Sequence, residues 1–292
     1  MTGTPSTNRS HSIATGLGGV LIVGLAHSGK TEVRRIVETS DRVHATRRVR
    51  HWAHIANTPG DPLASADLLD SASFVRHDGS PVSSDLDLSE VLTTWRSLEG
   101  PTFGGMLALL HHEEATRHGA EIWCAQVNRI ESLIERILVE LPAIKVVHTI
   151  RDPRDGLGVS RRSGIVGRRG WDLASWELSA RVAVASRDRH PGRYMIVRWE
   201  DLVASPQSVC GSLGQFVGAE LTVPDDWQPA GKPIGRGVRG KRTHSEIASL
   251  VDALGYDTAV PTPDSPVSDV VDLACYRIRS RRLRRRARGS IR

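Results

Sequence analysis

The sequence predicts an α/β protein with three layers, in which a central, mainly parallel sheet lies between two layers of helices. Apolar, strand-like stretches occur at Val20–Val23, Ile144–Ile150 and Arg193–Trp199, and a helical pattern follows each of them. The first two of these strands also run directly into residues that are typical of anion binding. Strands that alternate with helices favour parallel pairing, with helices on both faces of the sheet.

The first strand leads into a glycine-bounded loop. Gly24, Gly29, Lys30 and Thr31 satisfy the pattern G-x-x-x-x-G-K-[ST], in which backbone N–H groups surround phosphate oxygens at a helix N-terminus. The next residues, Glu32–Val37, place their apolar side chains on one helical face. Lysine occurs at only four positions in the chain, so a lysine in this loop is not a neutral choice. The pattern predicts a P-loop NTPase-like fold and a phosphate-bearing nucleotide as ligand.

The middle of the sequence is less regular. Between residues 40 and 120, turn signals containing Pro and Gly divide the chain into short pieces, and the main helix expected there is Phe103–His118. A short strand is expected at Ser71–Arg76, and Glu121–Ala125 is the next expected strand. Arg129–Leu141 is the clearest helix, because its apolar residues repeat at helical spacing up to Pro142.

Helices are also expected after the second and third strands. Asp152 can cap a helix that Pro153 opens, and Trp171–Arg189 is helical with apolar residues on one side. Pro206–Val217 forms a further helix that a glycine ends. Together these elements predict one α/β domain over residues 17–260.

The composition is that of an ordinary globular protein, with 39% hydrophobic and 25% charged residues. Cys124, Cys210 and Cys275 lie far apart and have no metal or redox spacing, which predicts buried thiols in a reducing compartment. The apolar stretch 13–26 superficially resembles a secretory signal, but cleavage there would destroy the glycine loop. We therefore expect a cytoplasmic protein.

Both ends of the sequence differ from the central part. Residues 1–16 are expected to form a disordered lead, and residues 261–292 a Pro-containing linker and an Arg-rich tail. The stretch 277–292 holds nine arginines and no acidic residue, so the net charge of +6 belongs to the tail. We expect a solvated, mostly disordered tail; weak electrostatic contact with an anionic membrane is the alternative. No specific nucleic-acid partner is expected, because the other basic clusters lack interleaved aromatic residues.

The end of the second strand resembles a motif of one enzyme family. His148–Ser160 is similar to the second nucleotide motif of sulfotransferases that use 3′-phosphoadenosine-5′-phosphosulfate (PAPS). In that family an arginine at the strand end and a serine on the following helix hold the 3′-phosphate, which implies these roles for Arg151 and Ser160. A guanidinium suits a dianionic phosphate because it offers a planar, permanently charged fork.

Two further stretches are similar to the same family. Arg193–Leu202, followed by Ser205 and Pro206, resembles a segment in which a strand leads through Trp-Glu-Asp-Leu into an apolar helix. Gly235–Lys241 resembles the mobile basic loop that closes over the 3′ side of the nucleotide. The resemblance covers most of residues 18–256 in the right order.

The resemblance implies a PAPS-dependent sulfotransferase that transfers a sulfuryl group to a hydroxyl or amine without a metal. The acceptor would be a small molecule, a glycan or a lipid. Lys30 would be catalytic by stabilising the leaving phosphate, with help from His27 when that side chain is protonated. The residues implied in donor binding are Gly24, Ser28, Gly29, Lys30, Thr31, Arg151, Ser160, Arg236 and Arg239.

The sequence departs from the family pattern at three places. Lys30 stands where Thr or Ser is common, and His27 stands where the family has its basic residue. Gln126 and its neighbours replace a Lys-Thr-Pro or Lys-Thr-His run, so the usual catalytic base is missing. Ser160 follows Asp155 one residue later than usual, which rotates a helical position by about 100°.

The sequence does not identify the catalytic base or the acceptor pocket. The candidate bases are Glu113, Glu114, His51 and His54. The default expectation for each is a solvated helix or loop residue. The tryptophans that could line an acceptor cavity, or pack in the core instead, are Trp52, Trp95 and Trp123. The run His111–Glu114 lacks the i, i+4 histidine pair of a zinc helix, so no metal site is expected.

Two other functions stay open at this stage, as does the oligomeric state. A P-loop kinase or NTPase would explain the full G-x-x-x-x-G-K-T match, but no strand clearly ends in a carboxylate that would hold magnesium. A catalytically degenerate member, which binds a nucleotide without turnover, would explain the altered residues His27 and Gln126.

Overall fold

A five-stranded parallel sheet forms the centre of the protein in the computed structural model, which describes residues 18–49, 88–97, 102–128, 130–153, 169–228, 247–256 and 276–285. The strands are β1 (Gly19–Gly24), β2 (Val43–Val49), β3 (Ile122–Val127), β4 (Lys145–Ile150) and β5 (Tyr194–Arg198). They lie in the order β2-β3-β1-β4-β5, and each neighbouring pair is parallel. The predicted parallel sheet is confirmed.

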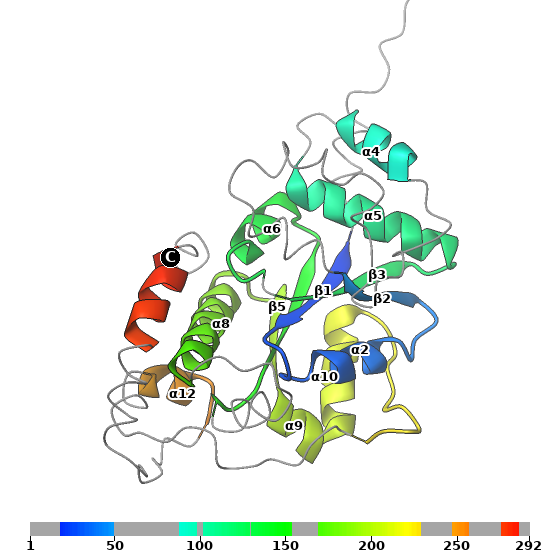
Figure 1. Ribbon diagram of the computed structural model, residues 1–292. Coiled ribbons are helices and arrows are strands. Elements are labelled where there is room, and N and C mark those ends of the chain that lie inside the picture. The colour runs from blue at the N-terminus through cyan, green and yellow to red at the C-terminus, as the bar shows by residue number, and fades with distance from the viewer. Residues whose placement is uncertain are drawn as a thin grey trace, which may run out of the picture.

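Helices cover both faces of this sheet, which makes the three layers predicted from the sequence (Figure 1). The helices on one face are α2 (Lys30–Val37), α9 (Trp199–Ala204) and α10 (Pro206–Val217). Those of the other face are α4 (Leu88–Arg96), α5 (Phe103–Arg117), α6 (Ile134–Glu140), α8 (Arg169–Arg189) and α12 (Ala248–Ala253).

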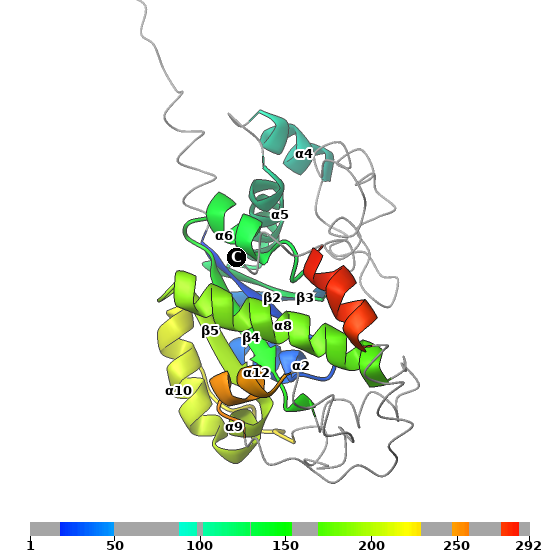
Figure 2. The ribbon, with the colours of Figure 1, turned by 90° about the vertical axis from the view of Figure 1, so that its left-hand side faces the viewer.

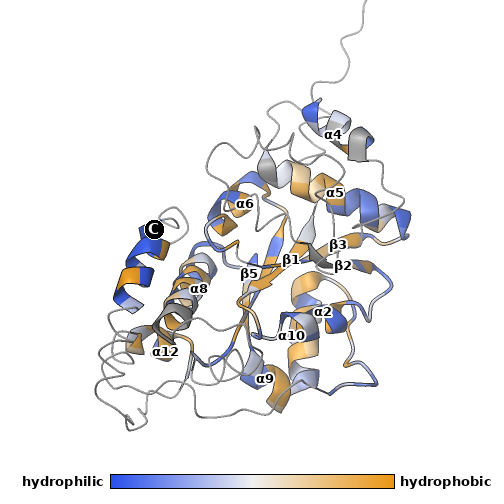
Figure 3. Cartoon of the chain, in the orientation of Figure 1, coloured by the Kyte–Doolittle hydropathy of each residue, from blue (hydrophilic) through white to orange (hydrophobic). Residues whose placement is uncertain are grey.

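Alternate residues of the central strands supply the core on the two faces. In β1, Val20 and Ile22 pack towards α2 and α10, whereas Leu21 and Val23 pack towards α5 and α6. This alternation follows from the two-residue period of a strand. Figure 3 shows the resulting apolar colouring of β1 between helices whose outer surfaces are hydrophilic.

The strand order places a topological switch point beside β1. The chain passes from β1 to β2 and β3 on one side, and then to β4 and β5 on the other. At the carboxyl ends of the strands, Gly24 of β1 lies opposite Thr149 of β4. Open parallel sheets bind ligands at this kind of position, which here lies at the carboxyl ends of β1 and β4, next to Gly24 and Arg151.

Strand β2 is not predicted from the sequence. Its sequence, VHATRRV, has few large apolar residues because it is an edge strand of the sheet. Val43 and Ala45 contribute to one core face, while His44 and Thr46 belong to a polar cluster on the other. The predicted short strand at residues 71–76 lies outside the described residues.

The Arg-rich tail is a correction to the sequence prediction. Residues 276–285 form a helix that runs beside α8 (Figures 1 and 2), rather than a disordered segment. Tyr276 and Ser280 are buried, and Leu283 packs against the core, so the helix is anchored at i, i+4 and i+7. The prediction was wrong here because a tyrosine precedes the arginine run and supplies an apolar anchor. Contact of the arginines with a membrane stays a prediction.

Glu177 of α8 lies beneath this C-terminal helix and is almost fully buried. Arg181 Nε donates to its Oε1 at 2.6 Å, and Arg284 Nε from the C-terminal helix lies 3.8 Å from the same oxygen. Burial raises the pKa of Glu177, but its hydrogen bonds and the charges of the two arginines lower that pKa overall. The arginine run is therefore partly a structural element.

Cys124 and Cys210 are buried free thiols, as predicted, and Cys275 lies outside the described residues. Among the helices of the described ranges, none combines the length and the apolar composition needed to cross a bilayer. The proposed boundaries of the domain, the N-terminal lead and the linker stay predictions.

Candidate active site

The glycine loop joins β1 to α2 as the motif predicts. Gly24 has φ 130° and Gly29 has φ 103°, which are conformations that favour glycine. A Cβ on Gly24 would lie 2.3 Å from the carbonyl oxygen of Thr149, and one on Gly29 would lie 2.8 Å from Cε3 of Trp199. Both glycines are therefore required by the backbone conformation and by the close approach of a neighbouring element.

Lys30 is the first residue of α2, and its side chain is buried inside the loop. Its Nζ donates to the carbonyl oxygen of Gly24 at 2.7 Å and also to that of Leu25. The lysine thus places a positive charge within the loop, beside the N-terminus of a helix whose dipole adds to that charge.

Ser28 is also buried, and its hydroxyl connects the loop to β4. The Oγ donates to the carbonyl oxygen of Leu25 at 2.7 Å and lies 2.6 Å from Oγ1 of Thr149. Thr149 in turn contacts the carbonyl oxygen of Val23 at 3.2 Å. The hydroxyl of Ser28 therefore bonds within the protein and fixes the loop. We expect Ser28 to contribute to donor binding through its backbone instead.

Arg151 reaches from the end of β4 to this loop. Its Nη1 lies 3.5 Å from the carbonyl oxygen of His27, at the outer limit of a hydrogen bond, and the guanidinium carbon lies 5.0 Å from the ring centre of Trp199. His27 itself has φ 63°, a left-handed conformation that is rare for a residue with a side chain. Two of the cationic residues predicted for the donor site thus lie close together, with Lys30 in the glycine loop and Arg151 beside that loop.

The peptide group that follows Arg151 is held at both ends. Trp176 Nε1 of α8 donates to the carbonyl oxygen of Arg151 at 2.8 Å, and the N–H of Asp152 donates to Glu200 Oε1 of α9 at 2.9 Å. The hydroxyl of Tyr256 donates to Glu200 Oε2 at 3.0 Å. No role is predicted from the sequence for Trp176, Glu200 or Tyr256.

Gln126, which replaces the family's Lys-Thr run, lies near the carboxyl end of β3 beside Ile22 of β1. The side chain is buried, and its Oε1 has no hydrogen-bond partner among the described residues. No side chain able to act as the family's usual base stands at this position, as the sequence indicated.

His148 belongs to the second motif but faces away from the loop, towards α8. Its Nδ1 lies 2.6 Å from the hydroxyl of Tyr194, and its Nε2 lies 2.8 Å from Oγ of Ser179. Burial, and secondarily the charge of Lys30, lowers the pKa of His148 to about 3. This histidine is a neutral core residue.

Glu114 corrects the expectation of a solvated candidate base. It is buried between β2 and α5, where Thr46 Oγ1 donates to its Oε2 at 2.7 Å. His44 Nε2 lies 3.6 Å from Oε1 and His111 Nδ1 lies 3.7 Å from Oε2. Because Thr46 is in register with Ala125 of β3, the cluster is separated from β1 and its loop by a whole strand. We call residues His44, Thr46, His111 and Glu114 the β2–α5 cluster.

Burial by itself raises the pKa of Glu114, but hydrogen bonds from His111, His44 and Thr46 outweigh burial and hold this pKa well below its usual range. Within the described ranges, no group of three or more His, Cys, Asp or Glu side chains could hold a metal ion. The independence from metal stays a prediction.

Several predicted site residues cannot be placed. Those outside the described residues are Ser160, Arg236, Arg239, His51, His54 and Trp52. Of the other two tryptophans, Trp95 donates its Nε1 to the carbonyl oxygen of Thr102 at 2.9 Å, and Trp123 is buried beside His111. Both pack in the core.

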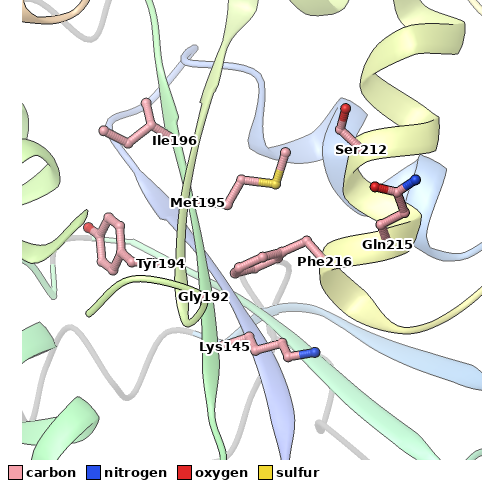
Figure 4. Close-up of a pocket in the computed structure, with 8 residues that line it drawn as sticks. All are labelled: Lys145, Gly192, Tyr194, Met195, Ile196, Ser212, Gln215 and Phe216. Atoms are coloured by element: carbon pink, nitrogen blue, oxygen red, sulfur yellow. The ribbon is translucent and has the colours of Figure 1, made fainter. Parts of the chain in front are cut away.

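One open hollow lies at the other end of the sheet, and it does not belong to this site. It has a volume of about 580 Å³ and includes Lys145 at the start of β4, Met195 of β5 and Phe216 of α10 (Figure 4). Strand starts and strand ends lie at opposite edges of a parallel sheet, so this hollow is far from Gly24 and Arg151.

Comparison with known proteins agrees with the motifs. A family model described as "Sulfotransferase family" matches residues 19–223. Among solved structures, the chain is similar to the sulfotransferase domain of the Synechococcus PCC 7002 olefin synthase (14% identity, TM-score 0.47, 89% of this chain and 94% of that one). It is also similar to sulfotransferase STF9 from Mycobacterium avium (12% identity, TM-score 0.47, 83% and 78% covered).

A third similar structure is a retinol dehydratase in complex with androsterone and the inactive cofactor PAP (14% identity, TM-score 0.43, 85% and 83% covered). No curated protein sequence matches the chain. These structural similarities are distant, whereas the family model spans most of the chain, including the glycine loop, Arg151 and Glu200. The chain belongs to the sulfotransferase family.

Proposed function

We propose that the protein transfers a sulfuryl group from PAPS to a hydroxyl or amine of a small molecule, glycan or lipid. The observation that carries this proposal is the position of Arg151, whose guanidinium lies between the glycine loop and Trp199. One ligand with anionic groups at both the 5′ and the 3′ position could contact the loop and Arg151 together.

The residues at the loop fit the 5′ side of such a donor. The N-terminal turn of α2 offers backbone N–H groups without acceptors inside the helix, and Gly24 and Gly29 allow close approach of the backbone. Lys30 adds a buried ammonium that can move from the carbonyls of Gly24 and Leu25 to phosphosulfate oxygens. Arg151 fits the 3′-phosphate, for which a guanidinium gives charge-assisted, paired hydrogen bonds.

The proposed reaction breaks the bond between sulfur and the 5′-phosphate oxygen and forms a bond between sulfur and the acceptor oxygen or nitrogen. The acceptor loses one proton to a base that the described residues do not identify, and Glu114 is too enclosed for this role. The negative charge that develops on the leaving phosphate oxygen would be stabilised by Lys30, with His27 as a second candidate.

Calorimetric titration with adenosine 3′,5′-bisphosphate and with adenosine 5′-monophosphate tests the donor assignment. We expect the bisphosphate to bind about 10 to 100 times more tightly, because charge-assisted hydrogen bonds to a phosphate contribute about 1.5–3 kcal/mol. Arg151→Ala should remove most of this preference. Equal affinity of the wild-type protein for both ligands would contradict the proposal.

The full G-x-x-x-x-G-K-T match also suits an ATP- or GTP-dependent kinase or NTPase. Two further titrations, with ADP and with ATP plus magnesium, distinguish this function. A sulfotransferase should bind adenosine 3′,5′-bisphosphate best and should not need magnesium. Magnesium-dependent ATP turnover that Lys30→Ala abolishes would favour the alternative. Donor binding without a sulfated product from any acceptor would favour the catalytically degenerate member.

A further inference from the structure

The backbone next to Arg151 is held by side chains that come from three distant parts of the chain. The carbonyl of Arg151 and the N–H of Asp152 belong to one peptide group, because they are joined by the same C–N bond. Trp176 Nε1 donates to this carbonyl at 2.8 Å, and Glu200 Oε1 accepts from this N–H at 2.9 Å. The plane of one peptide is therefore fixed at both of its polar atoms.

The two side chains approach this peptide from opposite layers of the fold. Trp176 lies on α8 and packs with Leu173 and Ala180 in the core on that face. Glu200 lies on α9, next to Trp199, which belongs to the core on the α2 face. A peptide bonded from both layers cannot rotate without breaking at least one hydrogen bond, so the direction in which the Arg151 side chain leaves the backbone is restricted too.

Glu200 is itself held in place by a third segment. Its second oxygen accepts from the hydroxyl of Tyr256 at 3.0 Å, and Tyr256 is covered by the guanidinium of Arg198, 4.4 Å from its ring centre. Arg198 Nη1 also donates to the carbonyl of Gly255 at 3.0 Å. The carboxyl group therefore has a defined orientation, with one oxygen for the peptide and one for the phenol.

We infer that Glu200 and Trp176 are positioning residues for the nucleotide 3′-phosphate, because together they orient the Arg151–Asp152 peptide and with it the Arg151 guanidinium. Neither residue needs to touch the ligand. The inference rests on the proposed function, since it concerns the group that Arg151 binds. It goes beyond that function by assigning the specificity for the 3′-phosphate to residues on α8 and α9.

The raised pKa of Glu200 agrees with this arrangement. Burial raises this pKa, and the hydrogen bonds from the N–H of Asp152 and the hydroxyl of Tyr256 offset only part of the effect. The protein thus retains an acidic side chain beside an anion site at some cost in stability. A residue kept at such a place is consistent with a role in function rather than in folding.

The experiment compares the affinities of the full chain for adenosine 3′,5′-bisphosphate and adenosine 5′-monophosphate, and uses their ratio as the readout. Glu200→Leu and Trp176→Phe each remove one hydrogen bond to the peptide and should reduce the ratio about tenfold, because small misplacements of a binding group have large effects. Glu200→Gln keeps a carbonyl oxygen that can accept from Asp152, and it should retain the ratio. Glu220→Gln, at an exposed position after α10, is the control and should not change it.

A double-mutant cycle separates positioning from a general loss of structure. In the Arg151→Ala background, Glu200→Leu should not lower the ratio further, since the group that it orients is gone. A variant that weakens both ligands equally, and so leaves the ratio unchanged, would overturn the inference. If the wild-type protein binds both ligands equally, the proposed function fails. If the wild-type protein prefers the bisphosphate and the Glu200 and Trp176 variants keep that preference, the proposed function stands and the positioning role fails.

Discussion

Glu114 is a buried carboxylate and Glu200 a half-buried one, and their surroundings shift their pKa values in opposite directions. Glu114 is surrounded by hydrogen-bonding side chains of β2 and α5, which lower its pKa in spite of burial. Glu200 accepts hydrogen bonds from the backbone N–H groups of Asp152 and of Glu200 itself and from the hydroxyl of Tyr256, but these do not offset burial, so its pKa is raised.

The surroundings of the two carboxylates distinguish a structural polar group from one that serves a site. The β2–α5 cluster is satisfied by its own members and lies one strand away from the loop of β1. The Glu200 region joins segments from α8, α9 and the end of α12 at a peptide whose neighbour is Arg151. Changes in the first region should therefore affect stability alone, and changes in the second should affect ligand binding.

The largest expected effect on stability is that of Glu114→Ala. This change leaves Thr46, His44 and His111 around an empty position, and loss of one partner from a buried ionic group costs about 3–5 kcal/mol. Urea unfolding measures the loss, and Glu113→Ala on the same helix is the control. The affinity of the folded protein for adenosine 3′,5′-bisphosphate should not change. A loss of affinity would break the distinction between the two regions.

Gly29→Ala is expected to act on both stability and binding. The new Cβ would be placed in a left-handed conformation, only 2.8 Å from the indole of Trp199, which together cost about 2–4 kcal/mol. Gly119→Ala is a matched control, because Gly119 has φ 73° but nothing within 4 Å of the added Cβ. It should cost about 1 kcal/mol and leave ligand affinity unchanged. Equal losses in both variants would show that the contact with Trp199 is unimportant.

Thr46→Val tests a single hydrogen bond of the β2–α5 cluster. The substitution keeps the shape of the side chain but removes the hydroxyl that donates to Glu114 at 2.7 Å. A hydrogen bond to a charged group contributes about 1.5–3 kcal/mol, so the free energy of unfolding should fall by about this amount. The control Thr116→Val, at an exposed position of α5, should change the free energy of unfolding by less than about 0.5 kcal/mol.

The smallest effects are the opposite pH dependences of Glu114→Gln and Glu200→Gln. A lowered pKa contributes stability that is present above the ordinary value of 4.5 and lost as the pH falls below it, so Glu114→Gln should flatten the acid side of the stability curve. A raised pKa contributes stability that is present below 4.5 and lost as the pH rises through the folded value. Glu200→Gln should therefore reduce the decline above pH 4.5. Unfolding midpoints between pH 3 and 8 test both, and slopes of the same sign would contradict the comparison.

Features encoded by neighbouring residues could be predicted from the sequence. The glycine loop, the strands around it and helices α5, α8 and α10 each depend on a local pattern, and the structure contains them. The helix expected over Arg129–Leu141 is shorter in the structure, where α6 begins at Ile134 and ends at Glu140. Arg151 could be placed beside the loop because parallel strands end at the same edge of a sheet. The meeting of Arg151 and His27 follows from that geometry.

Features that depend on distant contacts could not be predicted. Glu114 meets Thr46, and Glu200 meets the N–H of Asp152, between residues that no periodic pattern relates. Edge strand β2 lacks the apolar run by which buried strands are recognised. The helix over residues 276–285 depends on a tyrosine and a serine that pack on α8, and an arginine count alone suggests a solvated tail.

The docking of the C-terminal helix has a practical consequence for anyone who shortens the chain for crystallisation. Its high arginine content makes it a candidate for removal. A cut before residue 276 would remove Arg284 from the buried carboxyl group of Glu177, which would keep its ion pair with Arg181. It would also open to water the apolar stripe of α8 that Tyr276 and Leu283 cover. A truncated protein that ends after residue 285 should stay soluble, whereas one that ends before residue 276 should aggregate.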